Sequence, residues 1–397
     1  MSRWEVFGSL LAMGFLVNFV RVVFAPLLQP VAAEFHVSAA SLGVVTTAAW
    51  LGSAAPRLPT GYLLIRVDRH LVIAVTGVLL VVASVFTALS SSVLHLVVGA
   101  FLLGLSSGMY FIAANPLVSE LFPRRILRAI AIHGLARQVA AVGAPLVIAL
   151  VLFVADWRTT FFGVAIVAAI TTAGLLYTAR WTDLPAAGES DRSLVAAGRS
   201  QWRIILTGIV FIGAVGFLWN GLFNLYGGYL EAAKEIGPAT GPLLLSLMFA
   251  AGIPAFLLAT RIGERFPTLP LIIGLIASFA VSVLALTVVG TAIGVAAVSL
   301  VIAFSFYLFV ALLDTYMLST LPDHHRGSAY AIYSAVMMVI QAMGSGVIGS
   351  AVAAGTSYDD LFRVLSLVVV GIAVAMFLLH TTDRLPAGPA PSRQRSG

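Results

Sequence analysis

The sequence contains no cysteine and very little charge. The absence of cysteine among 397 residues excludes disulfides, thiol catalysis and cysteine metal sites. Only 10% of the residues are charged and 60% are hydrophobic, whereas soluble domains carry about 25% charged residues. The mean hydropathy is +1.05. This composition predicts an all-α polytopic membrane protein.

Twelve apolar runs are long enough to cross about 30 Å of hydrocarbon as helices. Six lie before a polar stretch and six lie after it. The first run has no small-residue cleavage site, so we interpret it as span 1 and not as a signal peptide. The runs are 7–31, 42–64, 71–90, 93–117, 130–153, 160–179, 204–230, 243–259, 269–289, 293–313, 329–353 and 362–380.

The net charge of +6 comes almost entirely from arginine, with Lys234 as the single lysine. If the amino terminus lies inside, the cytoplasmic segments hold nearly all the basic residues, and the external loops hold only Arg158, Lys234 and Arg363. This bias follows the positive-inside rule. We therefore expect a multi-pass protein of the cytoplasmic membrane with both termini cytoplasmic and the lipid bilayer as its surroundings. We expect no nucleic-acid partner.

Three short segments recur at a spacing of roughly 200 residues, which indicates an internal duplication. "GFLVN" ending at Asn18 returns as "GFLWN" ending at Asn220, "RVDR" (66–69) as "RIGER" (261–265), and "FPRRILRAIAIH" (122–133) as "LPDHHRGSAYAIY" (321–333). Because each half has six spans, both copies point the same way through the membrane. The predicted domains are 1–180 and 204–383, with a cytoplasmic linker at 181–203 and a disordered cytoplasmic tail at 384–397.

The loop after span 2 and the entry to span 6 carry recognisable motifs. Gly61, Leu63, Arg66 and Arg69 match a loop pattern G-x-L-a-D-R-x-G-R-R, and "DWRTTF" (156–161) matches W-R-x-x-F. On these residues the chain resembles the major facilitator superfamily over essentially its whole length. The resemblance implies two parallel-repeat six-helix bundles with 12 transmembrane helices. It also implies a monomeric secondary transporter that works by rocker-switch alternating access, and no enzyme, cofactor or metal.

The loop motif departs from the family pattern, because Ile65 replaces the aspartate and Asp68 the second glycine. Two interpretations stay open for this cluster. Its basic residues could anchor helix ends to lipid headgroups, or, as the resemblance implies, latch the two halves together. The residues concerned are Gly61, Arg66, Asp68 and Arg69, with Arg261 and Arg265 in the second copy.

Arg57 lies inside an apolar run between Pro56 and Pro59. A charge in hydrocarbon costs at least about 2.5 kcal/mol, so it usually faces a wet cavity or a partner. We predict a substrate-anion ligand, with snorkelling to the inner headgroups as the alternative. Its spacing of four residues from Gly61 resembles the span-2 arginine of nitrate/nitrite porters, although the matching place in span 8 is Gly252.

Two further arginines, Arg21 and Arg137, fall inside spans, against one clear acid, Asp314. An interior with this imbalance favours an anion. We therefore predict a transporter of a small anionic solute, with a proton or counter-anion as coupling partner. An exporter of hydrophobic or cationic drugs by proton antiport is the alternative, kept open by a partial glycine-proline motif at 143–145. "GLSSG" (104–108) matches a hydrolase pattern but lies in a helical run, where it predicts helix packing.

Polar side chains at mid-span depth complete the predicted site. The substrate-binding set is Arg57, Arg21, Asn18, Asn220, Asn224, Tyr226 and Trp50, with helix packing as the alternative for the amides and aromatics. Arg137 and Asp314 are predicted to form an inner gate, with separate partners in each half as the alternative. His133 and Asp314 are the candidates for proton coupling.

Overall fold

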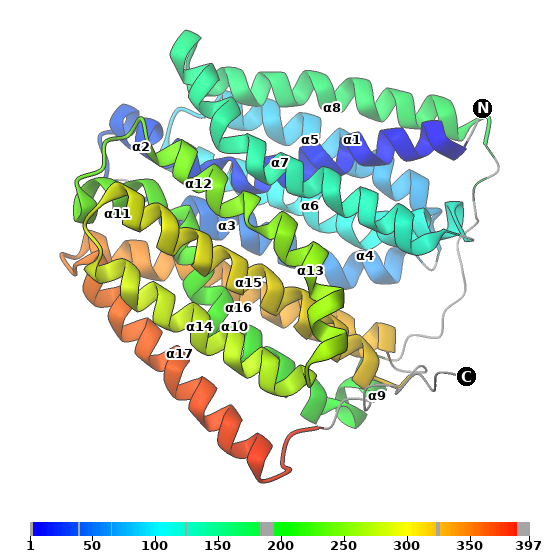
Figure 1. Ribbon diagram of the computed structural model, residues 1–397. Helices are drawn as coiled ribbons and strands as arrows, with labels where there is room; N and C mark the ends of the chain where they lie inside the picture. Colours follow the sequence, from blue (N-terminus) through cyan, green and yellow to red (C-terminus); the bar gives the residue numbers. More distant parts are fainter. Residues whose placement is uncertain are drawn as a thin grey trace. The chain divides into compact units, whose positions relative to one another are not determined.

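The computed structural model describes residues 3–38, 40–64, 66–123, 125–182, 184, 194–322 and 326–386, and in this part of the chain the regular secondary structure is helical (Figure 1). The helices of the first half are α1 (Arg3–Val22), α2 (Phe24–Phe35), α3 (Gly43–Ala54), α4 (Arg57–Leu63), α5 (Arg69–Ala88), α6 (Val93–Leu121), α7 (Ile126–Val154) and α8 (Trp157–Ala179). A short helix, α9 (Leu194–Ser200), lies in the predicted linker. The second half contains α10 (Trp202–Asn224), α11 (Tyr226–Lys234), α12 (Gly241–Ala250), α13 (Gly252–Arg265), α14 (Thr268–Val288), α15 (Ala292–Thr320), α16 (Arg326–Ala353) and α17 (Tyr358–Thr381).

The first two predicted spans of each half are interrupted helices. The interruptions fall at Val23, at Ala55 and Pro56, at Leu225 and at Ala251. The second has a direct cause, since Pro56 has no backbone N–H and its ring disfavours a continuous helix. The breaks occupy matching places in both halves, which agrees with the internal duplication.

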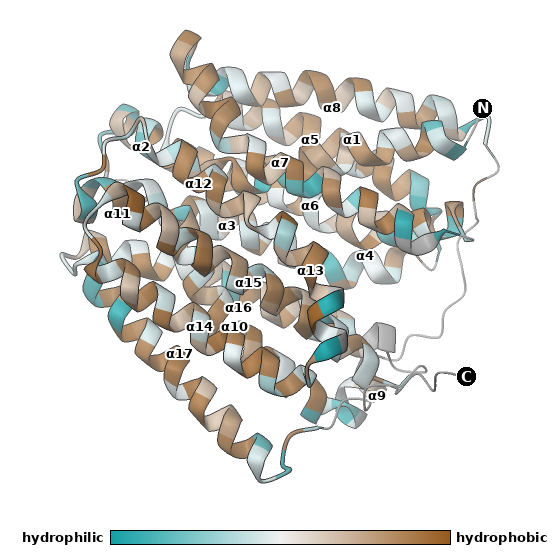
Figure 2. Cartoon of the chain, in the orientation of Figure 1, coloured by the Kyte–Doolittle hydropathy of each residue, from teal (hydrophilic) through white to brown (hydrophobic). Residues whose placement is uncertain are grey.

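Within the described residues, 11 helical segments are long and apolar enough to cross a membrane. The proline-broken pair of α3 and α4 supplies the twelfth, because neither piece alone is long enough. The predicted fold class, 12 membrane helices in two six-helix repeats, is therefore confirmed. Figure 2 shows hydrophobic residues along nearly the whole length of α14 and α17.

The chain divides into two compact units. Unit 1 comprises 1–190, 220–246 and 342–355, and unit 2 comprises 191–219, 247–341 and 356–397. In unit 1, α6 packs against α3, α5 and α1, and α8 packs against α5. In unit 2, α14 packs between α15 and α17. The domain boundaries predicted from the sequence stay a prediction.

Glycines bring α3 and α6 into close contact in unit 1. A Cβ atom on Gly104 would collide with the carbonyl of Ala49, and one on Gly108 with the carbonyl of Ser53. From the other side, a Cβ on Gly52 would collide with the carbonyl of Phe101. Helix packing, as predicted from "GLSSG", is confirmed, and it sets the height of the α6 side chains relative to α3.

Unit 1 also joins the start of α3 to the end of α16. Thr46 Oγ1 donates a hydrogen bond of 2.6 Å to Ser345 Oγ, and Thr47 Oγ1 lies 3.3 Å from the same atom. Gly43 permits this close approach because it has no Cβ atom; a Cβ there would collide with the Ser345 carbonyl. In the predicted topology both helix ends are external, so this contact links the two halves of the sequence there.

Candidate functional site

Two arginines from different helices lie against one aromatic ring in unit 1. The Cζ atom of Arg21, on α1, is 5.1 Å from the ring centroid of Phe111, and the Cζ atom of Arg137, on α7, is 5.0 Å from it. Because both Cζ atoms are measured to the same ring centroid, they lie no more than about 10 Å from each other. Both side chains are partly exposed. Cations favour the faces of aromatic rings, so Phe111 of α6 can hold two like charges at this place.

Trp50 extends the aromatic wall on the Arg21 side. Its ring centroid is 4.3 Å from Arg21 Cζ, and the indole is only 6% exposed. On its other side Trp50 makes an edge contact with Phe223 of α10, at 5.9 Å between ring centroids. The Arg21 side chain is thus held against rings from α3 and α6, and Trp50 itself is held by α10.

Asn18 fixes the height of α1 relative to α7. Its carboxamide Nδ2 donates a hydrogen bond of 2.6 Å to the main-chain carbonyl of Arg137, and the residue is 9% exposed. This carboxamide is engaged with protein, so Asn18 positions Arg137. Asn115 lies one helical turn beyond Phe111 on α6, and its buried Oδ1 has no hydrogen-bond partner among the described residues.

Arg137 leaves part of its hydrogen-bonding capacity unused among the described residues. Its Nε atom is buried and has no acceptor within the described part of the chain. In that same part no carboxylate lies within ion-pair distance of its guanidinium. A cation removed from water without a compensating partner is costly. An anionic group brought to this guanidinium would lower that cost.

His133 lies one helical turn before Arg137 and is fully buried. Its Nε2 atom is 2.8 Å from the Tyr110 hydroxyl, which itself hydrogen-bonds the Leu10 carbonyl. Since a carbonyl only accepts, the Tyr110 hydroxyl donates to Leu10 and accepts from His133 Nε2–H. The bare His133 Nδ1 then has no partner among the described residues. The structure thus gives His133 a partner that its sequence context does not reveal.

Arg57 begins α4 and is partly exposed. Its Nε–H donates a hydrogen bond of 3.3 Å to the carbonyl of Ser53, four residues earlier on α3. The side chain is therefore turned back along its own span at the proline break. Its role as an anion ligand stays a prediction.

The remaining predicted substrate residues lie on α10 and α11 and are buried. Asn224 Nδ2 donates 2.9 Å and 3.2 Å hydrogen bonds to the main-chain and side-chain oxygens of Asn220. Asn220 and Tyr226 are both 0% exposed. This pairing of the two amides joins neighbouring turns of one helix, and their contact with a solute stays a prediction.

In the loop motif, the basic residues find partners within the first half. Arg69 forms an ion pair of 3.0 Å with Glu120, near the end of α6. Arg66 lies against the Tyr62 ring, at 5.5 Å from Cζ to the centroid. Ile65 is outside the described residues. Gly61 and Asp68 are partly exposed, and Arg261 and Arg265 are exposed on α13. The latch between halves stays a prediction.

Asp314 accepts a hydrogen bond of 3.0 Å from the Tyr330 hydroxyl. It belongs to unit 2, whereas Arg137 belongs to unit 1. The gate between Arg137 and Asp314, and proton coupling through Asp314 or His133, therefore stay predictions. Among the described residues, no three His, Asp or Glu side chains gather as metal ligands would.

The W-R-x-x-F motif ties α8 to α2. Arg158 forms an ion pair of 2.6 Å with Glu34, and the Trp157 indole N–H donates to the same carboxylate. The hydrogen bond from Arg158 lowers the pKa of the Glu34 carboxyl. This contact joins the end of α2 to the start of α8.

The fold and this polar interior define a membrane transporter, and comparison with known proteins identifies the family. The sequence model of the Major Facilitator Superfamily matches residues 10–345. The chain belongs to this superfamily. A search of curated proteins finds no match.

Solved structures agree with this assignment at the level of the fold. A bacterial homologue of the human lysosomal transporter Spinster, inward-facing and occupied, superposes with a TM-score of 0.76 at 19% identity, covering 98% of this chain and 99% of that one. A D-xylose-proton symporter superposes with a TM-score of 0.74 at 16% identity, covering 95% of this chain and 98% of that one. A POT family transporter in complex with 5-aminolevulinic acid superposes with a TM-score of 0.78 at 12% identity, covering 95% of this chain and 96% of that one. Family and fold point to a secondary transporter with alternating access and not to an enzyme.

Proposed function

We propose that this protein transports a small anionic solute and that Arg21 and Arg137 bind its negative charge. The observation that carries the proposal is the pair of guanidiniums against Phe111, with no carboxylate paired to Arg137 among the described residues. A guanidinium offers up to five N–H donors in a fixed fork and matches carboxylate, phosphate and similar oxyanions.

The surroundings of the two arginines support the proposal. Phe111 and Trp50 provide apolar walls that raise the strength of a charge-assisted hydrogen bond by excluding water. Asn115 Oδ1 adds a buried acceptor without a partner in the described part of the chain. An anion that also carries a hydroxyl or amine donor could satisfy this oxygen. The preferred class is therefore a small organic anion with a donor group.

Thermal unfolding of the purified protein against a panel of anions and of cationic or hydrophobic compounds tests the proposal. A ligand that binds only the folded state raises the melting temperature by mass action. We expect one class of anions to stabilise the wild type, and Arg21→Gln and Arg137→Gln to lose most of that shift. Arg363→Gln is the matched control, because Arg363 pairs with exposed Asp360 far along the sequence.

Two outcomes would contradict the proposal. The first is stabilisation by anions that is equal in the wild type and in both variants. The second is stabilisation by cationic or hydrophobic compounds alone, which would favour the drug-exporter alternative. Arg57→Gln belongs in the same series, since loss of the anion shift in that variant would add Arg57 to the ligand set.

A further inference from the structure

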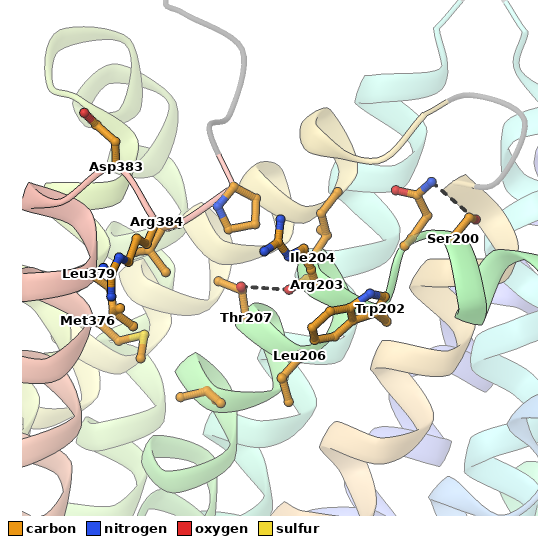
Figure 3. Close-up of a pocket in the computed structure, with 14 residues that line it drawn as sticks. Ser200, Trp202, Arg203, Ile204, Leu206, Thr207, Met376, Leu379, Asp383 and Arg384 are labelled. Atoms are coloured by element: carbon orange, nitrogen blue, oxygen red, sulfur yellow. Dashed lines mark hydrogen bonds between the residues drawn. The ribbon is translucent and has the colours of Figure 1, made fainter.

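A basic pocket lies in unit 2 where α10 begins and α17 ends (Figure 3). We call it the arginine pocket; its volume is about 490 Å³, and Arg203, Arg384, Trp202, Met376 and Leu379 are among its lining residues. Figure 3 shows Arg203 and Arg384 on opposite walls, with the Asp383 carboxylate apart from both. Among the described residues neither guanidinium forms an ion pair.

The backbone at the end of α17 places Arg384 on the wall of the arginine pocket. Asp383 has a left-handed backbone (φ 53°), and the N–H of Arg384 returns to the carbonyl of Leu379 at 3.0 Å. This is the backbone pattern of a Schellman helix end, which reverses the chain. Two residues later, the Tyr316 hydroxyl donates a 2.6 Å hydrogen bond to the Pro386 carbonyl. Arg384 therefore lies in a segment that is hydrogen-bonded on both sides, to Leu379 of α17 and to Tyr316 of α15.

A second cavity shares Val210 with the arginine pocket and continues along α10 and α17. We call it the apolar groove; its volume is about 400 Å³, and every residue that lines it is apolar, including Gly213, Phe217, Val368 and Ile372. From Arg203 to Phe217 the helix advances by about 21 Å at 1.5 Å per residue. This is about half of the 40–45 Å thickness of a bilayer with its headgroups.

We propose that the arginine pocket and the apolar groove together bind one anionic phospholipid, with the phosphate between Arg203 and Arg384 and an acyl chain along the groove. The charge, the apolar continuation and the length each match one lipid in one leaflet. Trp202 is 56% exposed beside the pocket, as indoles are at the membrane interface. The positive-inside topology places the pocket at the cytoplasmic leaflet, where anionic lipids gather. The inference does not depend on the solute proposed above.

Lipid binding to the full-length protein in neutral detergent tests the inference, with native mass spectrometry to count retained lipids and thermal unfolding to rank them. The probes are dioleoyl phosphatidylglycerol, dioleoyl phosphatidylcholine and glycerol 1-phosphate. We expect one phosphatidylglycerol to be retained and to raise the melting temperature. We expect phosphatidylcholine, which has no net charge, and glycerol phosphate, which has no acyl chain, to do neither.

Variants separate the charge from the groove. Arg203→Gln and Arg384→Gln should each weaken phosphatidylglycerol binding about fivefold, the share of one basic residue near an anionic surface. Arg363→Gln should leave the binding unchanged. Gly213→Leu adds a side chain beside Ile340, whose nearest atoms lie 3.6 Å from an ideal Cβ, and should block the groove. Gly274→Leu, at a position with nothing within 4 Å, is its control.

Three results would overturn the inference. Equal retention of phosphatidylcholine would mean ordinary boundary lipid. Binding of glycerol phosphate as tight as that of phosphatidylglycerol would mean a soluble-phosphate site. Unchanged phosphatidylglycerol binding in the double variant Arg203→Gln/Arg384→Gln would remove the arginines from the site. The arginine variants are informative even if Gly213→Leu fails to fold, because both arginines lie at helix ends.

Discussion

The Asn18 carboxamide donates a 2.6 Å hydrogen bond to the main-chain carbonyl of Arg137. This bond joins α1 to α7 at the level where each helix presents an arginine to Phe111. We therefore expect Asn18 to act on the proposed anion site by positioning Arg137, while its predicted contact with the solute stays a prediction. The distinction leads to a measurable difference between Asn18 and Arg137.

Asn18→Ala should lower the free energy of unfolding by about 0.5–1.5 kcal/mol, the usual net value of a hydrogen bond. It should reduce the melting-temperature shift given by the best anion without abolishing it, whereas Arg137→Gln should abolish it. Thr76→Ala is the control, since the Thr76 hydroxyl donates to the Val72 carbonyl within its own helix. Complete loss of the anion shift in Asn18→Ala would instead make Asn18 a direct ligand.

Gly104→Ala should destabilise the protein by several kcal/mol or prevent its expression. The added Cβ would collide with the Ala49 carbonyl, and a backbone group cannot move aside as a flexible side chain can. Gly143→Ala on α7 is the matched control, because nothing lies within 4 Å of its ideal Cβ. At that position the higher helix propensity of alanine should raise the free energy of unfolding by as much as about 1 kcal/mol. Detergent-solubilised yield and thermal unfolding measure both, and equal behaviour of the two variants would contradict the close contact of α3 and α6.

The ion pair of Glu34 and Arg158 should make stability fall in acid. Because Arg158 lowers the pKa of Glu34 in the folded protein, the pair stabilises the fold above the unfolded pKa of about 4.3. This stabilisation is lost as pH falls through the lower, folded pKa. The effect should stay below about 1 kcal/mol, since the pair is partly exposed. The difference in melting temperature between wild type and Glu34→Gln should therefore shrink on acidification, and a difference that grows would contradict this account.

Thr46→Cys together with Ser345→Cys should give a disulfide that blocks transport. The two hydroxyl oxygens are 2.6 Å apart and the chain has no cysteine of its own, so the background is zero. Alternating access requires contacts between the two halves of the sequence to open and close. Oxidation should stop solute uptake and reduction should restore it, whereas each single cysteine variant should be insensitive. Full activity in the oxidised double variant would show that this contact stays closed during the cycle.

The membrane spans could be predicted from the sequence because hydrocarbon thickness fixes the length of an apolar helix. The break at Pro56 also has a local cause in the sequence, namely the missing proline N–H. The break at Ala251 has one too, because Pro254 has no N–H to donate to the carbonyl of Ala250, the last residue of α12. The break at Leu225 has no proline in the four residues that follow it. Helix ends were less predictable: α6 continues to Leu121, beyond the predicted end at 117, and this extra turn carries Glu120 to Arg69.

The candidate site was predictable in its charges but not in its assembly. Arg21 and Arg137 stand out in sequence because buried charge is rare in a membrane. Phe111 has no such signal, since aromatic residues at helical spacing usually pack. Its contact with both arginines depends on how α1, α6 and α7 pack. The partner of His133, Tyr110, lies 23 residues away on another helix for the same reason.

Uptake into proteoliposomes tests the central claim most directly. The substrate is the anion that stabilises the purified protein most, and wild type is compared with Arg137→Gln and Arg363→Gln at equal reconstituted amounts. The account predicts saturable uptake by wild type and by Arg363→Gln, and at least a tenfold loss in Arg137→Gln, about 1.4 kcal/mol of lost interaction with the anion. Uptake by Arg137→Gln equal to that of the wild type would contradict it.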